Sequence, residues 1–155
     1  MSLCILYATV GGTTEQIARQ AADYLTARGH AVECVDVSLL AASDLAAWDR
    51  VIFGCSTYDE GEMNPLAAAF FDQLAAARVK APHVRVAIFG LGESIYPSFC
   101  TGADRAGEAW EVVGANVVSP ILKLDMLEWD ADARTRVIHD WLDEILPKLA
   151  AGRQA

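Results

Sequence analysis

The sequence predicts an α/β fold in which a parallel sheet is covered by helices on both faces. Two observations lead to this prediction. Short apolar runs of strand length recur along the chain, and segments with apolar residues at helical spacing alternate with them. Strands that are separated by helices pair in parallel, and such a sheet is buried on both faces. We expect five strands.

The first strand and the first helix are the clearest elements. The run LCILYA, residues 3 to 8, has the length and composition of a buried strand. Residues 14 to 28 then carry an apolar stripe at helical spacing, made of Ile17, Ala18, Ala21, Ala22 and Leu25. Gly29 follows where a glycine commonly ends a helix. The residues between strand and helix form a short connecting loop.

The next elements repeat this alternation. Strands are expected at residues 31 to 37 (AVECVDV) and 50 to 56 (RVIFGCS), with a short helix or turn in SLLAASDLAAW between them. Asn64 followed by Pro65 is typical of a helix start, with a capping residue before a first-turn proline. This pair predicts a helix over residues 66 to 79.

The C-terminal half supplies the last two strands. They are expected at residues 84 to 92 (VRVAIFGLG) and 115 to 125 (ANVVSPILKLD), and a helix between them ends at Gly114. The closing helix has one apolar stripe, made of Val137, Ile138, Trp141, Leu142, Ile145 and Leu149. We expect a single domain over residues 1 to 150 and a disordered tail at 151 to 155.

Composition excludes several classes of protein. The 155 residues are 54% hydrophobic and 21% charged, which is typical of a globular chain and not of a disordered one. No apolar run approaches the roughly 18 residues of a membrane span, and the N-terminus lacks the features of a secretory signal, so we expect a cytoplasmic protein. The net charge of −9 argues against a nucleic-acid groove. It suits an acidic surface that meets basic protein partners, although solubility alone is an alternative explanation.

The cysteines and histidines form no recognisable motif. Cys4, Cys34, Cys55 and Cys100 are scattered without a C-x-x-C pair, and three of them lie in strand-like segments. We therefore expect buried, reduced thiols. The 3 histidines lie far apart in the sequence, so no metal site is predicted.

The stretch ATVGGTTE, residues 8 to 15, leaves the first strand and enters the first helix. Its glycines allow backbone N–H groups to turn inward, and the helix adds the positive end of its dipole, so the loop suits an anion. The hydroxyls of Thr9, Thr13 and Thr14 are further donors. A terminal phosphate held by uncharged donors is one interpretation, and a helix capped by threonine is the other.

Two other phosphate loops fit this stretch poorly. A nucleoside-triphosphate loop requires a lysine that is absent here. A dinucleotide fingerprint requires G-x-G-x-x-G, which Gly11 and Gly12 do not supply, although Asp36 stands at the distance expected of a ribose ligand.

Two more loops should lie at the same edge of the sheet. STYDEGEMN follows the third strand and carries Tyr58, and GLGESIYPSFC ends the fourth and carries Tyr96 and Phe99. Ligands of such sheets bind beyond the carboxyl ends of the strands. Two tyrosines there could stack on opposite faces of a flat ring, each contributing about 1 kcal/mol, or could simply cover the end of the sheet. Beside a phosphate loop, they indicate a mononucleotide with an aromatic head.

These motifs resemble those of a known family. ILYATVGGTTEQIA resembles the phosphate signature of flavodoxins, aromatic-x-[ST]-x-x-G-x-T, with Tyr7, Thr9, Gly12 and Thr14 on the matching positions. GCSTYDEGE and FGLGESIYPSFC are similar to the two flavin-enclosing loops of short-chain flavodoxins, and FCTGADRAGEAWEVVGANVV continues the match. The tail LKLDMLEWDADARTRVIHDWLDEIL resembles the MioC and YqcA branch. The resemblance implies a flavodoxin-like three-layer sandwich with strand order 2-1-3-4-5.

The resemblance also implies FMN as the cofactor. Tyr96 would lie on one face of the flavin ring and Tyr58 on the other, and backbone groups of Thr57, Glu93 and Cys100 would meet its pyrimidine edge. The 5′-phosphate would be held by Thr9, Val10, Gly11, Gly12, Thr13 and Thr14. The other expected contacts in the same loops are Ser56, Asp59, Gly61, Gly90, Gly92 and Phe99.

The function implied is that of a carrier that shuttles single electrons between a flavoprotein reductase and an acceptor enzyme. The alternatives are an FMN-dependent NAD(P)H:quinone reductase and a flavodoxin-like module without cofactor. Negative charge around the flavin ring would disfavour the transfer of a second electron to the flavin. The alternative is that the acidic loop residues are simply solvated. The acidic residues expected there are Asp59, Glu60, Glu62 and Glu93.

The sequence departs from the family at two places. Asp59 and Glu60 follow Tyr58, where many flavodoxins have glycine, so we expect the one-electron-reduced flavin to be less stabilised than in those relatives. Gly11 stands where relatives often have threonine, so one hydroxyl contact to the phosphate is expected to be missing.

Overall fold

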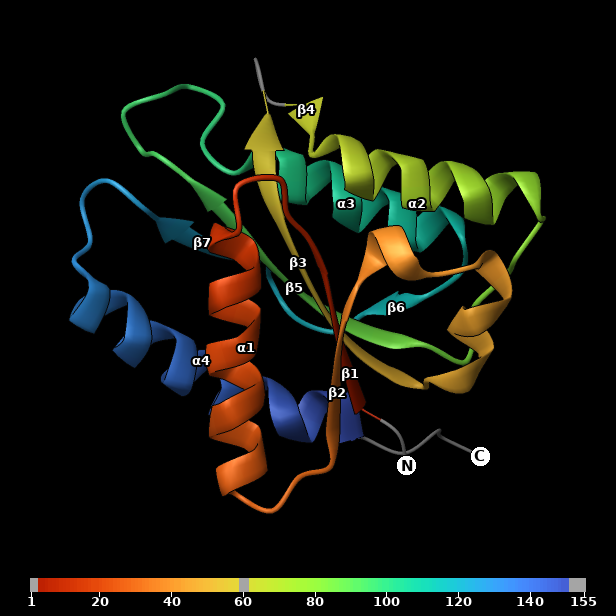
Figure 1. Ribbon diagram of the computed structural model, residues 1–155, viewed down its shortest axis with the longest axis horizontal. Coiled ribbons are helices and arrows are strands. Elements are labelled where there is room, and N and C mark those ends of the chain that lie inside the picture. Colours follow the sequence, from red (N-terminus) through yellow and green to blue (C-terminus); the bar gives the residue numbers. More distant parts are fainter. Residues whose placement is uncertain (1–2, 59–61, 151–155) are drawn as a thin grey trace.

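The protein is a three-layer α/β sandwich with a parallel sheet in the middle (Figure 1). The computed structural model describes residues 3–58 and 62–150, with only the backbone of Tyr58. Four strands, β1 (Leu3–Ala8), β2 (Val32–Asp36), β3 (Arg50–Tyr58) and β5 (Arg85–Gly92), pair in the order β2-β1-β3-β5. β5 is the fourth strand of the prediction, and the strand predicted at residues 115 to 125 pairs with its free edge. The expected order 2-1-3-4-5 is therefore confirmed.

The predicted last strand is divided into two short pieces. Both β6 (Asn116–Val117) and β7 (Leu122–Asp125) run parallel to β5, at its start and at its end respectively. Pro120 lies between them and has no N–H group to donate to the ladder, which explains the interruption. The short β4 (Glu62–Met63) pairs antiparallel with the end of β3 and was not predicted.

Four helices cover the sheet. α1 (Thr13–Ala27) and α4 (Ala131–Ala150) lie on one face, and α2 (Pro65–Ala76) and α3 (Thr101–Val112) lie on the other (Figure 1). The segment after β2 forms two 3-10 helices, at Val37–Leu39 and Ala42–Ala47, in agreement with the expected short helix or turn.

The predicted start of α2 is confirmed. The Asn64 Oδ1 accepts a hydrogen bond from the Leu66 N–H at 2.8 Å, and Pro65 occupies the first helical position. The helix ends at Ala76, three residues before the predicted residue 79. Arg78 shortly after it adopts a left-handed φ of 55°, which a helix cannot accommodate.

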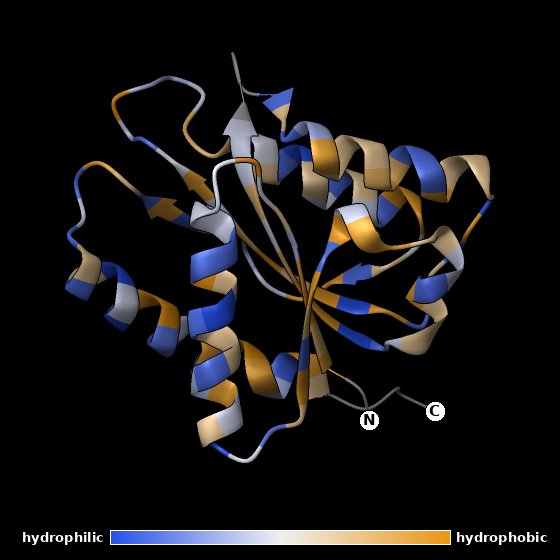
Figure 2. Ribbon diagram, in the orientation of Figure 1, coloured by the Kyte–Doolittle hydropathy of each residue, from blue (hydrophilic) through white to orange (hydrophobic). Residues whose placement is uncertain are grey.

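Successive strand residues alternate between two cores. Toward α2 and α3, Phe53 packs among the rings of Phe70, Phe71 and Trp110, with centroids 5.6 to 6.3 Å from its own. The core toward α1 and α4 is mainly aliphatic, and there Phe89 meets Trp141 edge to face. Figure 2 shows hydrophobic and hydrophilic residues alternating along α1, whereas α2 is hydrophobic over most of its length. The two cores hold the sheet rigidly beneath the loops at its carboxyl edge.

Among the residues that the structure describes, no helix is both long enough and apolar enough to cross a membrane.

Candidate functional site

The loop between β1 and α1 is shaped for an anion. Gly12 is the N-cap residue of α1 and adopts a left-handed conformation, with φ 91° and ψ −8°. Its N–H donates to the Thr9 Oγ1 at 2.8 Å, and its carbonyl accepts from the Gln16 N–H at 3.1 Å. Among the residues that the structure describes, no side chain caps the helix, so the interpretation as a threonine-capped helix is wrong. An uncapped helix start presents N–H groups and the positive end of the dipole to a bound anion.

The two glycines of this loop play different parts. Gly12 has the positive φ that residues with a side chain adopt only at a cost. Gly11 does not have a positive φ, and a Cβ atom added there would meet nothing within 4 Å. The structure therefore favours glycine at position 12 and leaves open space for a side chain at position 11.

A cavity of about 890 Å³ opens beside this loop, at the carboxyl edge of the sheet. This volume lies within the range of roughly 300 to 1,000 Å³ that is usual for cofactor sites. Seven of the predicted contact residues line it, namely Thr13, Ser56, Thr57, Gly92, Glu93, Tyr96 and Phe99. The sequence interpretation missed the other lining residues, which are Leu91, Pro97, Ser98 and Met126.

The phosphate-loop residues other than Thr13 flank the cavity instead of lining it. Val10 is 60% exposed, and Thr14 is buried at the start of α1. Together with Thr9, Gly11 and Gly12, they form the connection from β1 to the first turn of the helix.

Gly90 and Gly92 let the start of α3 pack closely on the end of β5. A Cβ atom at Gly90 would lie 2.4 Å from the Ala103 Cβ, and one at Gly92 would lie 2.9 Å from the Cys100 nitrogen. Gly90 and Cys100 do not line the cavity. Both lie in the packed layer next to it, and Cys100 begins α3 with a left-handed φ of 55°.

Part of the second predicted ring-binding loop lies outside the described residues. Asp59, Glu60 and Gly61 belong to this part, and so does the side chain of Tyr58. The placement of Tyr58 on the second face of the flavin ring therefore stays a prediction. The lower stability of the one-electron-reduced flavin stays a prediction as well.

Asn64 joins the ends of two strands at the site. Its Nδ2 donates to the Ser56 Oγ at 3.0 Å and to the Ala8 carbonyl at 3.4 Å. The Thr57 Oγ1 accepts from the Gly102 N–H at 3.1 Å, which holds α3 against the same end of β3. The sequence identified Asn64 as a helix cap, but its contact with Ser56 spans eight residues and its contact with Ala8 spans 56, and no local pattern shows either.

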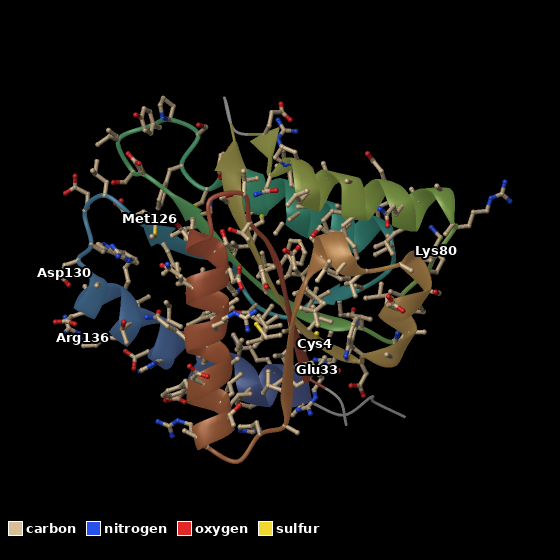
Figure 3. All side chains as sticks on the ribbon, viewed as in Figure 1. Cys4, Glu33, Lys80, Met126, Asp130 and Arg136 are labelled. Atoms are coloured by element: carbon tan, nitrogen blue, oxygen red, sulfur yellow. The ribbon has the colours of Figure 1, made fainter. Side chains whose placement is uncertain are left out.

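The loop after β7 forms one more wall. Met126 lies beside the start of α1, as Figure 3 shows, and its N–H donates to the Gly92 carbonyl at 2.8 Å. Asp125, directly before it, is only 5% exposed and accepts hydrogen bonds from three backbone N–H groups, those of Leu127, Glu128 and Ser94. Sequence reasoning missed both residues, and the one available signal was their place just beyond a strand's carboxyl end.

The thiols near the site are not activated. Burial raises the pKa of both Cys55 and Cys100 to about 12, and it raises those of Cys4 and Cys34 as well. All four cysteines are free thiols; Cys34 is partly exposed and the other three are buried, close to the expectation of buried reduced thiols. Within the described residues, no group of three His, Cys, Asp or Glu side chains could hold a metal ion.

Comparisons with known proteins agree with this geometry. The sequence profile of the family described as "Flavodoxin" matches residues 5–139. The chain is 30% identical over 132 residues to "Probable flavodoxin 1" of Bacillus subtilis, covering 84% of this chain and 82% of that one. It is 28% identical over 149 residues to "Protein MioC homolog" of Haemophilus influenzae, covering 96% and 99% of the two chains. The similarity to a MioC protein therefore extends over almost the whole chain, as the tail motif predicted.

A solved structure gives the same result for the fold. The structure of oxidised Flavodoxin 2 from Bacillus cereus superposes with a TM-score of 0.83 at 27% sequence identity, over 97% of this chain and 99% of that chain. The profile match covers well over half of the sequence. The chain therefore belongs to the flavodoxin family, whose members bind FMN and transfer electrons.

Proposed function

We propose that this protein binds FMN in the cavity at the carboxyl edge of the sheet and carries single electrons between a flavoprotein reductase and an acceptor enzyme. The observation that carries the proposal is the uncapped start of α1, with Gly12 in its left-handed conformation, directly beside a cavity that Tyr96 lines. The site thus offers donors for a phosphate and an aromatic side chain for a ring, side by side.

The residues present fit the phosphate end of FMN. The segment from Thr9 to Thr14 would hold the phosphate through backbone N–H groups and hydroxyls. No lysine or arginine lies in this segment. Oriented N–H dipoles and the positive helix end can stabilise a dianion without a cation. When bound, FMN supplies the redox chemistry, and the protein sets its orientation and electrostatic surroundings.

The ring end fits as well. The walls of the cavity are mainly apolar, with Leu91, Phe99 and Met126 among the lining residues. Tyr96 is 57% exposed, so its side chain is available to cover a flat ligand. The hydroxyls of Ser56 and Thr57 and the backbone at Glu93 are the polar groups that would meet the edge of the flavin.

The partners would be recognised by charge. Glu93 lines the cavity, Glu62 is exposed beside the end of β3, and the whole chain carries a net charge of −9. The apolar side chains of Ile95 and Leu127 are 60% and 50% exposed in the two neighbouring loops. An acidic surface with exposed apolar residues suits a basic partner and brief contact, and its association should weaken as salt is added.

The test is an FMN titration of the purified protein, followed by flavin fluorescence and absorbance. We expect saturable quenching with one FMN per chain, and then reduction of the bound flavin by a flavoprotein reductase at a rate that falls with salt. Steady-state oxidation of NADH or NADPH with a quinone, by the FMN-loaded protein alone, would instead support the quinone reductase. A protein that never quenches FMN would contradict both functions and support a module without cofactor.

A further inference from the structure

We propose that Asp125 is a positioning residue that fixes the loop carrying Tyr96, and thereby sets the affinity of the ring end of the site for flavin. This inference rests on the proposed FMN function. It concerns a residue that is not among the cofactor contacts expected from the sequence.

Asp125 lies between two walls of the cavity. It is the last residue of β7, and its register partner in β5 is Gly92, where the Tyr96 loop begins. One carboxylate oxygen, Oδ1, accepts from the Leu127 and Glu128 N–H groups at 3.1 Å each and from the Ser94 N–H at 3.4 Å. A single buried carboxylate therefore joins the loop after β5 to the loop after β7.

The Tyr96 loop has few other attachments to the body of the protein. Its remaining backbone hydrogen bonds among the described residues are mostly turns within the loop, such as those from the Tyr96 N–H to the Glu93 carbonyl and from the Phe99 N–H to the Tyr96 carbonyl. Ser94 lies two positions before Tyr96, and its N–H bonds to Asp125 at the end of β7. Residues 94 to 97 are exposed, so packing contributes little to their order.

Asp125 also sets the position of Met126. The Met126 N–H bonds to the Gly92 carbonyl at 2.8 Å, and the next two N–H groups bond to Asp125. The loop after β7 is thus folded around the carboxylate, and Met126 in this loop lines the same cavity as Tyr96. Loss of the carboxylate would release both walls together.

The electrostatics agree with this role. Desolvation of the carboxylate alone would raise the pKa of Asp125, but hydrogen bonds from Ser94, Glu128 and Leu127 outweigh it and hold the pKa below its usual value. Asp125 is therefore ionised at neutral pH, and hydrogen bonds to an ionised acceptor are stronger than those to a neutral one.

The chain offers a matched control for the test. Asp130, five residues along, also accepts a backbone hydrogen bond through its carboxylate, from the Ala133 N–H at 2.8 Å. That bond lies at the start of α4, where Figure 3 shows Asp130. Asp125→Ala and Asp130→Ala remove the same charge from the same segment, and only the first removes a contact with the Tyr96 loop.

The experiment compares FMN with riboflavin, which lacks the phosphate, and adds hydrogen exchange of the apoprotein. For Asp125→Ala we expect both dissociation constants to rise by about tenfold and the Ser94 amide to exchange at least tenfold faster in the absence of flavin, since a hydrogen bond to an ionised acceptor is lost. Asp125→Asn keeps an acceptor oxygen and should give intermediate values. Asp130→Ala should stay within about twofold of the unaltered protein.

Three results would overturn the inference. These are unchanged affinities in Asp125→Ala, a loss for FMN without a matching loss for riboflavin, or an equal loss in Asp130→Ala. If Asp125→Ala does not fold, Asp125→Asn must show smaller but measurable changes of the same kind. Failure of the unaltered protein to bind either flavin would contradict the proposed function instead, and the exchange rate of the Ser94 amide would still test the positioning role.

Discussion

The proposed flavin site has two ends, one for the phosphate and one for the ring, and they are built in different ways. The phosphate end is one continuous stretch from Thr9 to Thr14, and its internal hydrogen bond joins residues three positions apart. The ring end is assembled from segments that are distant in the sequence, through bonds such as those from Gly102 to Thr57, 45 positions apart, and from Ser94 to Asp125, 31 positions apart. The phosphate end therefore depends on local backbone conformation, whereas the ring end depends on the packing of the whole sheet.

The strongest test of this difference is Gly12→Val. A β-branched residue in the left-handed conformation that Gly12 adopts costs on the order of 2 kcal/mol or more. We expect the dissociation constant of FMN to rise about 100-fold and that of riboflavin to change by less than about threefold, because only FMN carries a phosphate. Both constants are measured by fluorescence titration.

Gly11→Ala is the matched control, since a Cβ atom at Gly11 would meet nothing within 4 Å. It should bind both flavins within about twofold of the unaltered protein. An equal loss of riboflavin affinity in Gly12→Val would show that the two ends are not independent.

The next largest effect is expected at Asn64, which links the two ends. Asn64→Ala removes a helix cap and leaves the Ser56 hydroxyl without its donor. We expect the free energy of unfolding of the apoprotein to fall by about 2 kcal/mol, as the sum of a lost cap and a lost buried hydrogen bond. Urea denaturation measures this change.

Asn116 provides the comparison for Asn64, because it lies exposed in β6. Asn116→Ala should change the unfolding free energy by less than about 0.5 kcal/mol. Similar values for the two variants would mean that Asn64 does not join β1, β3 and α2 as the structure indicates.

The smallest effect is expected for Tyr96→Ala. Removing an aromatic contact worth about 1 to 1.5 kcal/mol should weaken FMN and riboflavin equally, by about tenfold. Tyr96→Phe keeps the ring and should bind both flavins nearly as well as the unaltered protein. A loss confined to FMN would place Tyr96 at the phosphate end and would contradict its assignment to the ring end.

Much of the fold could be predicted because its signals are local. The alternation of apolar runs with helical stripes predicted the parallel sheet and the helices on both faces, and the family resemblance implied the strand order. Asn64 and Pro65 predicted the start of α2 correctly. The division of the last strand was missed, although Pro120 stood within it, and the β4 pairing was missed because two residues are too few to form a pattern.

The candidate site was predicted unevenly for the same reason. Residues at or just beyond the carboxyl ends of strands could be identified from the sequence, and seven of the predicted contacts line the cavity. Met126 and Asp125 were missed, because their importance comes from hydrogen bonds to Gly92 and Ser94, which belong to another strand and its loop.

By itself, the sequence determined the order of the elements and the family and predicted the phosphate loop, because each depends on neighbouring residues whose spacing sets backbone conformation and burial. Only the tertiary structure decided which side chains form the walls of the cavity, how Asn64 joins three elements, and that a buried carboxylate holds the Tyr96 loop. These features depend on contacts between residues far apart in the chain, and such contacts exist only once the strands have paired in register.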